Sequence, residues 1–425
     1  MQLLPATFRA LEASLAFTPS NLASLALAQS FTQAVFAPVW GSLIDGGWSQ
    51  KSILVGGSAA WGILTFLLGW SSNLFTMFVI RIFIGIALAT LNPVSQCLIG
   101  SYIEEGERGL YFGFAQMALN LGSISCLLLA TPTSNISIGH WEGWRVSYYV
   151  IGCLSIALSA LIAMFMVQPE TPAPSHVASP SSLTTFWKVD TFRLIVYQGI
   201  FGTIPWGALT FATMYFQYVG FSDAQAAILL AFAMVGNMLG GLLGGYIGDQ
   251  LTKWSRFHGR PLTAQISVFC GIPFAVLIFS FRPTGASTGI LFVFLLFFFG
   301  LLSSWCSTGT NRPILTEVVP QRSWASVFSW LLALEGASGA LFGAPAVGLL
   351  AEMVFGYKST QLQVRHMSLE ERGSNATALS LAILSCTIVP WILCLFFYSF
   401  LHFTYKKDVE ANGELEPVAL PEANR

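Results

Sequence analysis

The sequence predicts an all-α polytopic membrane protein, and its composition is the first reason. Of 425 residues, 54% are hydrophobic and only 9% are charged, whereas a soluble domain carries about 25% charged residues. So few charges cannot cover a water-exposed surface, which excludes a soluble enzyme, a nucleic-acid-binding protein and a disordered scaffold. The formal net charge of -1 offers no attraction for a polyanion. The seven cysteines are scattered, so we expect no metal site, no disulfide framework and no cofactor.

Apolar runs of spanning length are the second reason. A spanning helix needs roughly 20 mostly apolar residues, and these runs lack the alternation of membrane β-strands. We expect helices at about 22–44, 52–71, 74–99, 109–130, 147–168, 191–218, 224–248, 263–281, 288–310, 325–355 and 377–403.

A polar, Pro- and Ser-rich stretch interrupts these runs in the middle of the chain. We interpret 169–190 as a cytoplasmic linker. It divides the chain into an N-terminal helical half, 1–168, and a C-terminal helical half, 191–403, followed by a cytoplasmic tail, 404–425.

The two halves repeat at one offset. Asp45 and Asp249 each follow a glycine by four positions and lie 204 positions apart (249 − 45), as do Phe17 and Phe221. A constant offset indicates duplicated halves in parallel order.

The repeat also predicts an incomplete first span. The counterpart of 191–218 would begin before Met1, so residues 1–14 can supply only its second half. We favour a truncated start, and the alternative is a chain of eleven spans and half a helix.

Loop charges predict the orientation. Lys and Arg accumulate on the cytoplasmic side. Placing the loops of Asp45 and Asp249 inside puts twelve of these cations there. Six remain outside, namely Arg9, Arg145, Arg282, Lys358, Arg365 and Arg372.

Two motifs resemble signatures of the major facilitator superfamily. Its loop signature, Gly-x-x-x-Asp-x-x-Gly-Arg/Lys, is matched loosely by Gly41, Asp45 and Lys51. The corresponding residues of the second half are Gly245, Asp249 and Lys253. The span-four signature, Arg-x-x-x-Gly-x-Gly-x-Ala, resembles the run from Arg81 to Ala89.

A closer resemblance, over nearly the whole chain, is to the spinster-like branch in its plant and protist members. Matching stretches include Pro93-Val-Ser-Gln96, Gly143-Trp-Arg-Val146 and Asn311-Arg-Pro313-Ile-Leu-Thr-Glu317. The resemblance implies a major facilitator fold of two pseudo-repeated six-helix halves, with eleven full spans visible. It also implies secondary transport of a small organic or lipid-like solute by alternating access, with proton coupling as an option. Leu88 stands where animal and bacterial members usually carry Glu, and their acidic–basic pair in span one would lie before Met1.

Polar groups at membrane depth are the candidates for substrate binding or coupling, because they are costly there. Glu335 could bind and release a proton, and Arg81 could pair with an anionic group or with Glu335 across the halves. The alternative for both is a structural charge satisfied by its neighbours. Further candidates for lining a central cavity, with helix–helix hydrogen bonding as the alternative, are Gln116, Asn120, Gln198 and Trp206.

Charges and glycines near the cytoplasmic helix ends are the candidates for gating. A carboxylate at a helix end and a cation in the following loop can hold neighbouring helices in one state, although a solvated loop is the alternative. The candidates are Gly41, Asp45, Lys51, Gly245, Asp249, Lys253, Arg108, Glu317 and Arg322.

A secondary transporter is therefore the favoured hypothesis. An intramembrane enzyme lacks support, because the five His are scattered and the two Asp lie at helix ends. No phosphate-binding Gly-x-x-x-x-Gly-Lys-Ser/Thr loop is present, so ATP does not drive transport directly. The remaining alternative is a non-transporting relative, either a sensor or a degenerate protein. The expected partners are a small-molecule or lipid-like substrate, protons and the lipid bilayer, with a monomer as the expected state and no nucleic acid.

Overall fold

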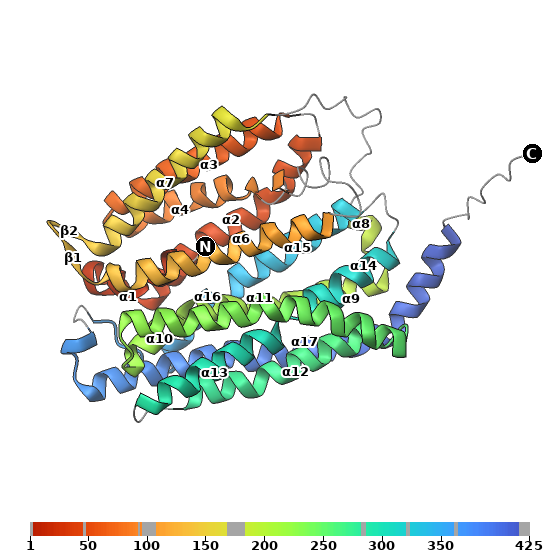
Figure 1. The fold of residues 1–425 in the computed structure, drawn as a ribbon. Helices are drawn as coiled ribbons and strands as arrows, with labels where there is room; N and C mark the ends of the chain where they lie inside the picture. Colours follow the sequence, from red (N-terminus) through yellow and green to blue (C-terminus); the bar gives the residue numbers. More distant parts are fainter. Residues whose placement is uncertain are drawn as a thin grey trace, which may run out of the picture.

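The helices lie side by side in two groups, one from each part of the chain (Figure 1). A computed structural model describes residues 3–45, 48–91, 94–95, 108–167, 183–281, 286–319, 324–360 and 364–415. The N-terminal group contains α1 (Leu3–Leu15), α2 (Pro19–Asp45), α3 (Gln50–Trp70), α4 (Leu74–Leu88), α6 (Arg108–Ser134) and α7 (Gly143–Phe165). A two-stranded antiparallel hairpin joins the last two, with Ser137 opposite Glu142; its strands are β1 (Ser137–Ile138) and β2 (Trp141–Glu142).

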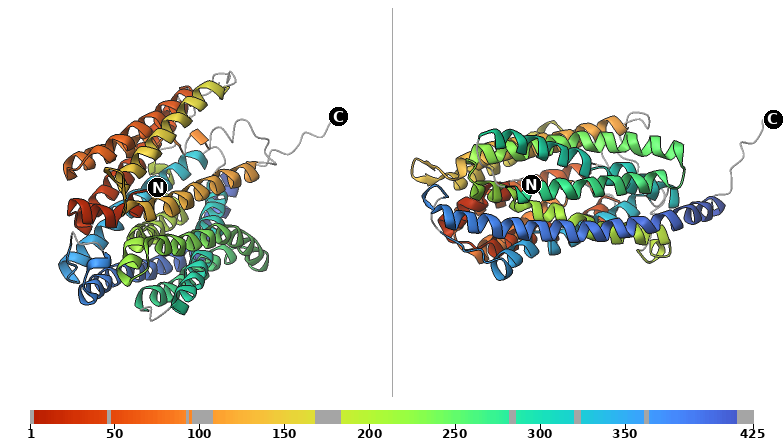
Figure 2. Two further views of the ribbon diagram at one scale, coloured as in Figure 1. Left: turned by 60° about the vertical axis from the view of Figure 1, so that its left-hand side comes forward. Right: turned by 90° about the horizontal axis from the view of Figure 1, so that it is seen from below.

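The helices of the C-terminal group are more often divided into shorter segments. It contains α8 (Leu183–Phe186), α9 (Asp190–Ala208), η1 (Leu209–Phe211), α10 (Ala212–Val219), α11 (Asp223–Trp254), α12 (Gly259–Ser280), α13 (Ala286–Ser303), η2 (Cys306–Asn311), α14 (Arg312–Val318), α15 (Trp324–Phe342), α16 (Ala344–Leu349), η4 (Leu350–Val354), η5 (Val364–His366) and α17 (Leu369–Leu415). Figure 2 shows the two groups in further views. The boundaries of the halves remain predictions, since residues 169–182 of the expected linker lie outside the described part.

The membrane spans agree with the sequence prediction. Within the described residues, ten helices are long and apolar enough to cross a membrane, and α4 is a shorter apolar helix. These eleven overlap the eleven expected runs, and the protein is an integral multi-pass membrane protein. The last span, Leu369–Ala411, has 43 residues. At 1.5 Å per residue it is about twice as long as the roughly 30 Å hydrocarbon core, so the predicted tail begins as a helix that extends beyond the bilayer.

Matching helix pairs confirm the repeat. In the N-terminal half α2 packs on α4 and α3 packs on α7, and in the C-terminal half α11 packs on α13 and α12 packs on α17. Across the halves α2 meets α15, and α11 meets α6. The order of the contacting helices is the same in both halves, which is the arrangement of two pseudo-repeated halves.

The repeated Phe17 and Phe221 mark equivalent helix starts. After Phe17, the Thr18 side chain accepts a hydrogen bond from the backbone N–H of Asn21 (3.3 Å) in the first turn of α2. After Phe221, Ser222 caps α11 and exchanges hydrogen bonds with Gln225. Such capping satisfies backbone donors that a helix leaves unpaired at its start.

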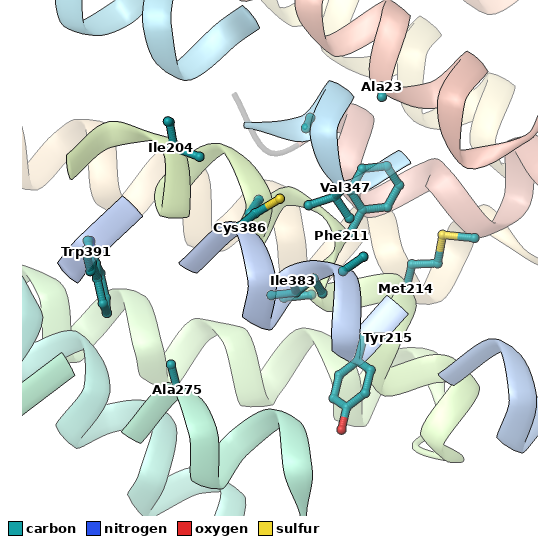
Figure 3. Close-up of a cluster of buried hydrophobic side chains, with 14 of the residues drawn as sticks. Ala23, Ile204, Phe211, Met214, Tyr215, Ala275, Val347, Ile383, Cys386 and Trp391 are labelled. Atoms are coloured by element: carbon teal, nitrogen blue, oxygen red, sulfur yellow. The ribbon is translucent and has the colours of Figure 1, made fainter. Parts of the chain in front are cut away.

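The C-terminal half has a continuous apolar core near the junction of α9, α10, α16 and α17. Figure 3 shows Phe211, Val347 and Ile383 close together, with Ala23 of α2 beside them. All are buried. The loops before α2, after α10 and at the β1–β2 hairpin lie together, at the left in Figure 1. We call this the outer end, and the end where α2, α11 and α17 terminate the inner end.

Candidate functional site

Arg81 lies inside the N-terminal half and is held by residues of that half. Its Nη2 donates to the Tyr148 hydroxyl of α7 at 2.9 Å, and its Nη1 donates to the Gln29 side chain of α2. The Tyr148 hydroxyl also lies 3.3 Å from the hydroxyl of Thr7 on α1. The suggested pairing of Arg81 with Glu335 is therefore wrong, because tyrosine and glutamine of its own half occupy the guanidinium. The Nε atom of Arg81 is buried and has no hydrogen-bond partner in the described part.

Glu335 of α15 is positioned by a close packing of α15 on α9. Gly199 makes room for it, because a β-carbon at that position would collide with the Glu335 carboxylate. The Thr203 hydroxyl donates to the Glu335 carbonyl oxygen (3.1 Å), and the Ser338 hydroxyl donates to the Ile200 carbonyl (2.8 Å). These bonds fix the register of the two helices and hence the place of the carboxylate.

The Glu335 carboxylate itself is only partly buried. Among the described residues it makes no hydrogen bond or ion pair, and Arg312 is the cation whose charge acts on it. One residue further along α15, a β-carbon at Gly336 would lie 3.1 Å from the Ala34 side chain of α2. The carboxylate thus lies beside the contact between the two halves.

Neutral polar side chains of the C-terminal half form a hydrogen-bonded set that includes Gln198, the residue before Gly199. The predicted Gln198 is buried, donates to the Ile195 carbonyl (2.7 Å) and accepts from the Cys394 thiol at 3.6 Å. The Tyr398 hydroxyl donates to Asn311 at 3.0 Å. Asn311 ends the π-helical segment η2, a type of distortion that is frequent at functional sites.

A second polar cluster, which the sequence did not predict, joins the halves at the outer end. Arg9 and Glu12 of α1 form an ion pair at 3.2 Å and are almost fully buried. Arg9 lies in α1 at the outer end, where the opposite half covers it. The Arg9 guanidinium also lies 5.2 Å from the centre of the Tyr218 ring.

The partners of Glu12 come from the C-terminal half. The Tyr357 hydroxyl donates to Oε1 at 2.6 Å and the Tyr218 hydroxyl donates to Oε2 at 2.9 Å. The backbone N–H of Thr360 adds a longer bond of 3.4 Å. The two tyrosine hydroxyls are 2.8 Å apart. We call Arg9, Glu12, Tyr218 and Tyr357 the outer cluster.

Two further contacts close the outer end. The Asn135 amide, which follows α6, donates to the Asp223 carboxylate of α11 at 2.9 Å. The backbone N–H of Ser20 donates to the Glu352 carboxylate at 2.6 Å. Each bond joins a residue of one half to a residue of the other, so the halves are closed against each other here.

The other predicted cavity residues give a mixed result. Trp206 is 38% exposed and packs against Phe299 and Trp391 inside the C-terminal half. Asn120 of α6 is half-buried and makes no hydrogen bond to any residue that the structure describes. The side chain of Gln116 lies outside the described part. Their roles in a cavity stay predictions.

The inner end of the C-terminal half carries an ion network around Arg260 of α12. Arg260 lies 3.4 Å from Asp249 and 3.5 Å from Glu317, and the Tyr405 hydroxyl donates to Glu317 at 2.7 Å. Lys253, the cation of the second-half motif, lies in the last turn of α11, which continues to Trp254.

The remaining gating candidates are only partly described. The side chains of Asp45, Arg108 and Arg322 lie outside the described residues. Lys51 lies in the first turn of α3. No atom lies within 4 Å of an added β-carbon at Gly41 or at Gly245, so neither glycine is required for a close approach.

Comparisons with known proteins agree with this geometry. The model of the Major Facilitator Superfamily matches residues 1–344. The cis,cis-muconate transport protein of Acinetobacter baylyi is 28% identical over 193 residues, which cover 42% of this chain and 43% of that protein. Vacuolar basic amino acid transporter 1 of Saccharomyces cerevisiae is 27% identical over 151 residues, which cover 34% of this chain and 26% of that protein. The matches thus span less than half the length of these curated relatives.

Solved structures share the fold. A bacterial homolog of the human lysosomal transporter Spinster, inward-facing and unoccupied, has a TM-score of 0.77 at 17% identity and covers 96% of this chain and 95% of its own. A D-xylose-proton symporter has a TM-score of 0.65 at 14% identity and covers 95% of each chain. Since the family model matches most of the chain and the helices repeat in two six-helix halves, this protein belongs to the Major Facilitator Superfamily.

Proposed function

We propose that this protein is a secondary transporter that moves a small organic or lipid-like solute by alternating access. The solute site lies between the halves. Glu335 lies on one side of it, and Arg81 with its partners Tyr148 and Gln29 lies on the other. Transport, rather than catalysis, is the activity, and protons are the proposed coupling ion.

The observation that carries this proposal is the unpaired Glu335 carboxylate beside the contact between the halves. During alternating access the site must at some stage be closed on both sides. A buried carboxylate without a partner is costly, so it must then be neutralised. A proton or a cationic group of the solute would do this, and either one would couple binding to the closure of the halves.

The outer cluster supports alternating access. Glu12 belongs to one half and its tyrosine donors belong to the other. Separation of the halves at the outer end would have to break these bonds, whereas closure restores them. The cluster therefore has the composition of an outer gate.

Uptake into proteoliposomes tests the function directly. We would measure entry of cis,cis-muconate, D-xylose, lysine and lysophosphatidylcholine, with a pH-sensitive dye trapped inside. We expect uptake of one of these classes to be accompanied by proton movement, and Glu335→Gln to abolish that movement. Equal proton movement in Glu335→Gln would remove Glu335 from coupling.

A cross-link across the outer end tests alternating access. Asn135→Cys and Asp223→Cys replace a pair that is hydrogen-bonded across the halves. A short bis-methanethiosulfonate reagent should join the double variant and stop uptake, and reduction should restore it. Each single variant controls for the native cysteines. Undiminished uptake by fully cross-linked protein would contradict alternating access, and an absence of uptake before cross-linking, for every solute, would favour the non-transporting relative.

A further inference from the structure

A pocket lies between α10, α12 and α17 at the outer end of the C-terminal half. Its volume is about 340 Å³, and its walls include Tyr215, Phe279, Ser380 and Leu381. Figure 3 shows Tyr215 with its hydroxyl directed away from the apolar core. This pocket is separate from the Glu335 site.

The one cation in the pocket wall is Arg372, in the first turn of α17. In the part of the chain that is described, its guanidinium makes no hydrogen bond and no ion pair. It lies against Gly220, where an added β-carbon would be 3.3 Å from Nη2. Gly220 ends α10 with a φ of 118°, a left-handed conformation that glycine adopts without strain. The negative end of the α10 dipole holds the cation in place but leaves its forked donors open.

The rest of the pocket is suited to hydrocarbon. Phe279, Leu381 and Leu384 line it, and its rim is open to the lipid-facing surface, since Leu369 is 77% exposed and Leu381 is 42% exposed. A guanidinium at one end and apolar walls at the other fit a molecule with an anionic head and an aliphatic tail. The bilayer is the adjacent source of such molecules.

We propose that this pocket binds an anionic phospholipid of the outer leaflet, with its phosphate on Arg372 and the start of one acyl chain against the apolar wall. The charge complementarity with an otherwise unpaired arginine selects this occupant over a zwitterionic lipid.

The pocket is connected to the outer cluster through a shared residue. Tyr218 forms part of the pocket wall, and its hydroxyl donates to Glu12 of the opposite half at 2.9 Å. A lipid in the pocket restricts the ring that makes this bond. Occupancy therefore stabilises the closed outer end, and the lipid acts as a regulator of the gate.

Thermal unfolding in nanodiscs tests the binding without any transport assay. We would compare phosphatidylcholine alone with phosphatidylcholine that contains phosphatidylglycerol. Phosphatidylglycerol should raise the unfolding temperature, and Arg372→Gln should weaken its apparent affinity by about tenfold, the loss expected for a charge-assisted hydrogen bond. Lys358→Gln, which removes an exposed outer-end cation outside the pocket, should leave the effect unchanged.

A second variant keeps the arginine but fills the pocket. Gly373 lines the pocket, and no atom lies within 4 Å of an added β-carbon there. Gly373→Leu should therefore fold and should abolish the phosphatidylglycerol effect. The proposal is overturned if both lipids act equally, if Arg372→Gln and Gly373→Leu respond as the unaltered protein does, or if Lys358→Gln loses the effect as well.

The link to the gate has its own readout. A cysteine in place of Asn135 reports the opening of the outer end through its labelling rate. Phosphatidylglycerol should slow the labelling, and Tyr218→Phe should abolish this slowing while the rise in unfolding temperature persists. If Tyr218→Phe leaves the slowing unchanged, the lipid does not act through the gate. These readouts do not depend on uptake, so their failure is distinct from a failure of the proposed transport.

Discussion

The hydroxyl of Tyr357 donates to the Glu12 carboxylate at 2.6 Å and so joins the two halves of the protein. Tyr357 follows the last π-helical turn of one half, and Glu12 lies on the first helix of the other. Because the carboxylate is fully buried, its tyrosine donors replace the water that it would otherwise bind. The stability of the closed outer end should therefore depend on this bond.

Tyr357→Phe should favour opening of the outer end. The variant keeps the ring but removes a hydrogen bond to a charged group, which contributes about 1.5–3 kcal/mol. We expect a cysteine at position 135 to be labelled at least about tenfold faster. Tyr149→Phe is the matched control, because the Tyr149 hydroxyl donates to a carbonyl within its own half, that of Gly69. If both variants have equal labelling rates, Tyr357 does not hold the gate.

The buried ion pair of Arg9 and Glu12 should affect the free energy of unfolding. Arg9→Met leaves Glu12 without its cation and should cost about 3–5 kcal/mol of unfolding free energy. The double variant Arg9→Met with Glu12→Leu removes both charges and should recover most of this loss. Denaturant unfolding in detergent measures both. A double variant that is less stable than Arg9→Met would show that the pair contributes more than it costs to bury.

Membrane depth was enough to select Glu335 and Gln198 from the sequence as candidates, and their roles stay predictions. Each lies in a long apolar run, where a polar side chain is expensive unless it has a purpose. Tyr398 and Asn311 gave no comparable signal, because neutral polar residues are common in spanning helices. Their part in the site depends on a helix crossing and on the π-helical turn η2, which a sequence pattern does not encode.

Glu12 could not be recognised from the sequence for a different reason. Residues 1–14 are too short to span alone, and nothing in their pattern indicates which residues cover Glu12. The tyrosines that bury Glu12 lie 206 and 345 positions away in the chain. The Arg260 network could not be recognised from the sequence either. Lys253 follows Asp249 closely in the sequence, but α11 continues past it. The cation that pairs with Asp249 comes from the next helix.

Gly199→Ala should mimic loss of the Glu335 carboxylate. The added methyl group would occupy the space of that side chain and displace it. We expect solute-dependent proton movement to fall by about tenfold or more, the size of effect that a small misplacement of a reacting group can cause. Gly245→Ala, which meets no atom within 4 Å, is the control. Normal proton movement in Gly199→Ala, in protein that unfolds at the usual temperature, would show that the position of Glu335 is unimportant.

Arg260→Gln should loosen the inner end of the C-terminal half. Arg260 lies near two carboxylates, those of Asp249 and Glu317, and is itself mostly buried. Its removal takes this cation away from both carboxylates, and we expect a loss of about 1–3 kcal/mol together with faster proteolysis of the loop after α11. Lys253→Gln removes an exposed cation of α11, the helix that carries Asp249, and should change neither quantity. Equal effects of the two variants would show that net charge, rather than the network, matters.

Acid should weaken the packing of the outer hairpin on α1 through Glu142. Burial raises the pKa of this carboxyl, but hydrogen bonds from Ser14 and Arg145 and the arginine's charge outweigh it, so the folded pKa lies below the usual 4.5. A carboxyl with a lowered folded pKa stabilises the protein above its unfolded pKa and loses this contribution as the pH falls through the folded value. The unfolding temperature should therefore decrease below about pH 4.5 more steeply in the unaltered protein than in Glu142→Gln. Glu370→Gln, at an exposed position of the same end, should retain the steep decrease. If Glu142→Gln has the same pH profile as the unaltered protein, the Ser14 and Arg145 bonds do not stabilise the charged form.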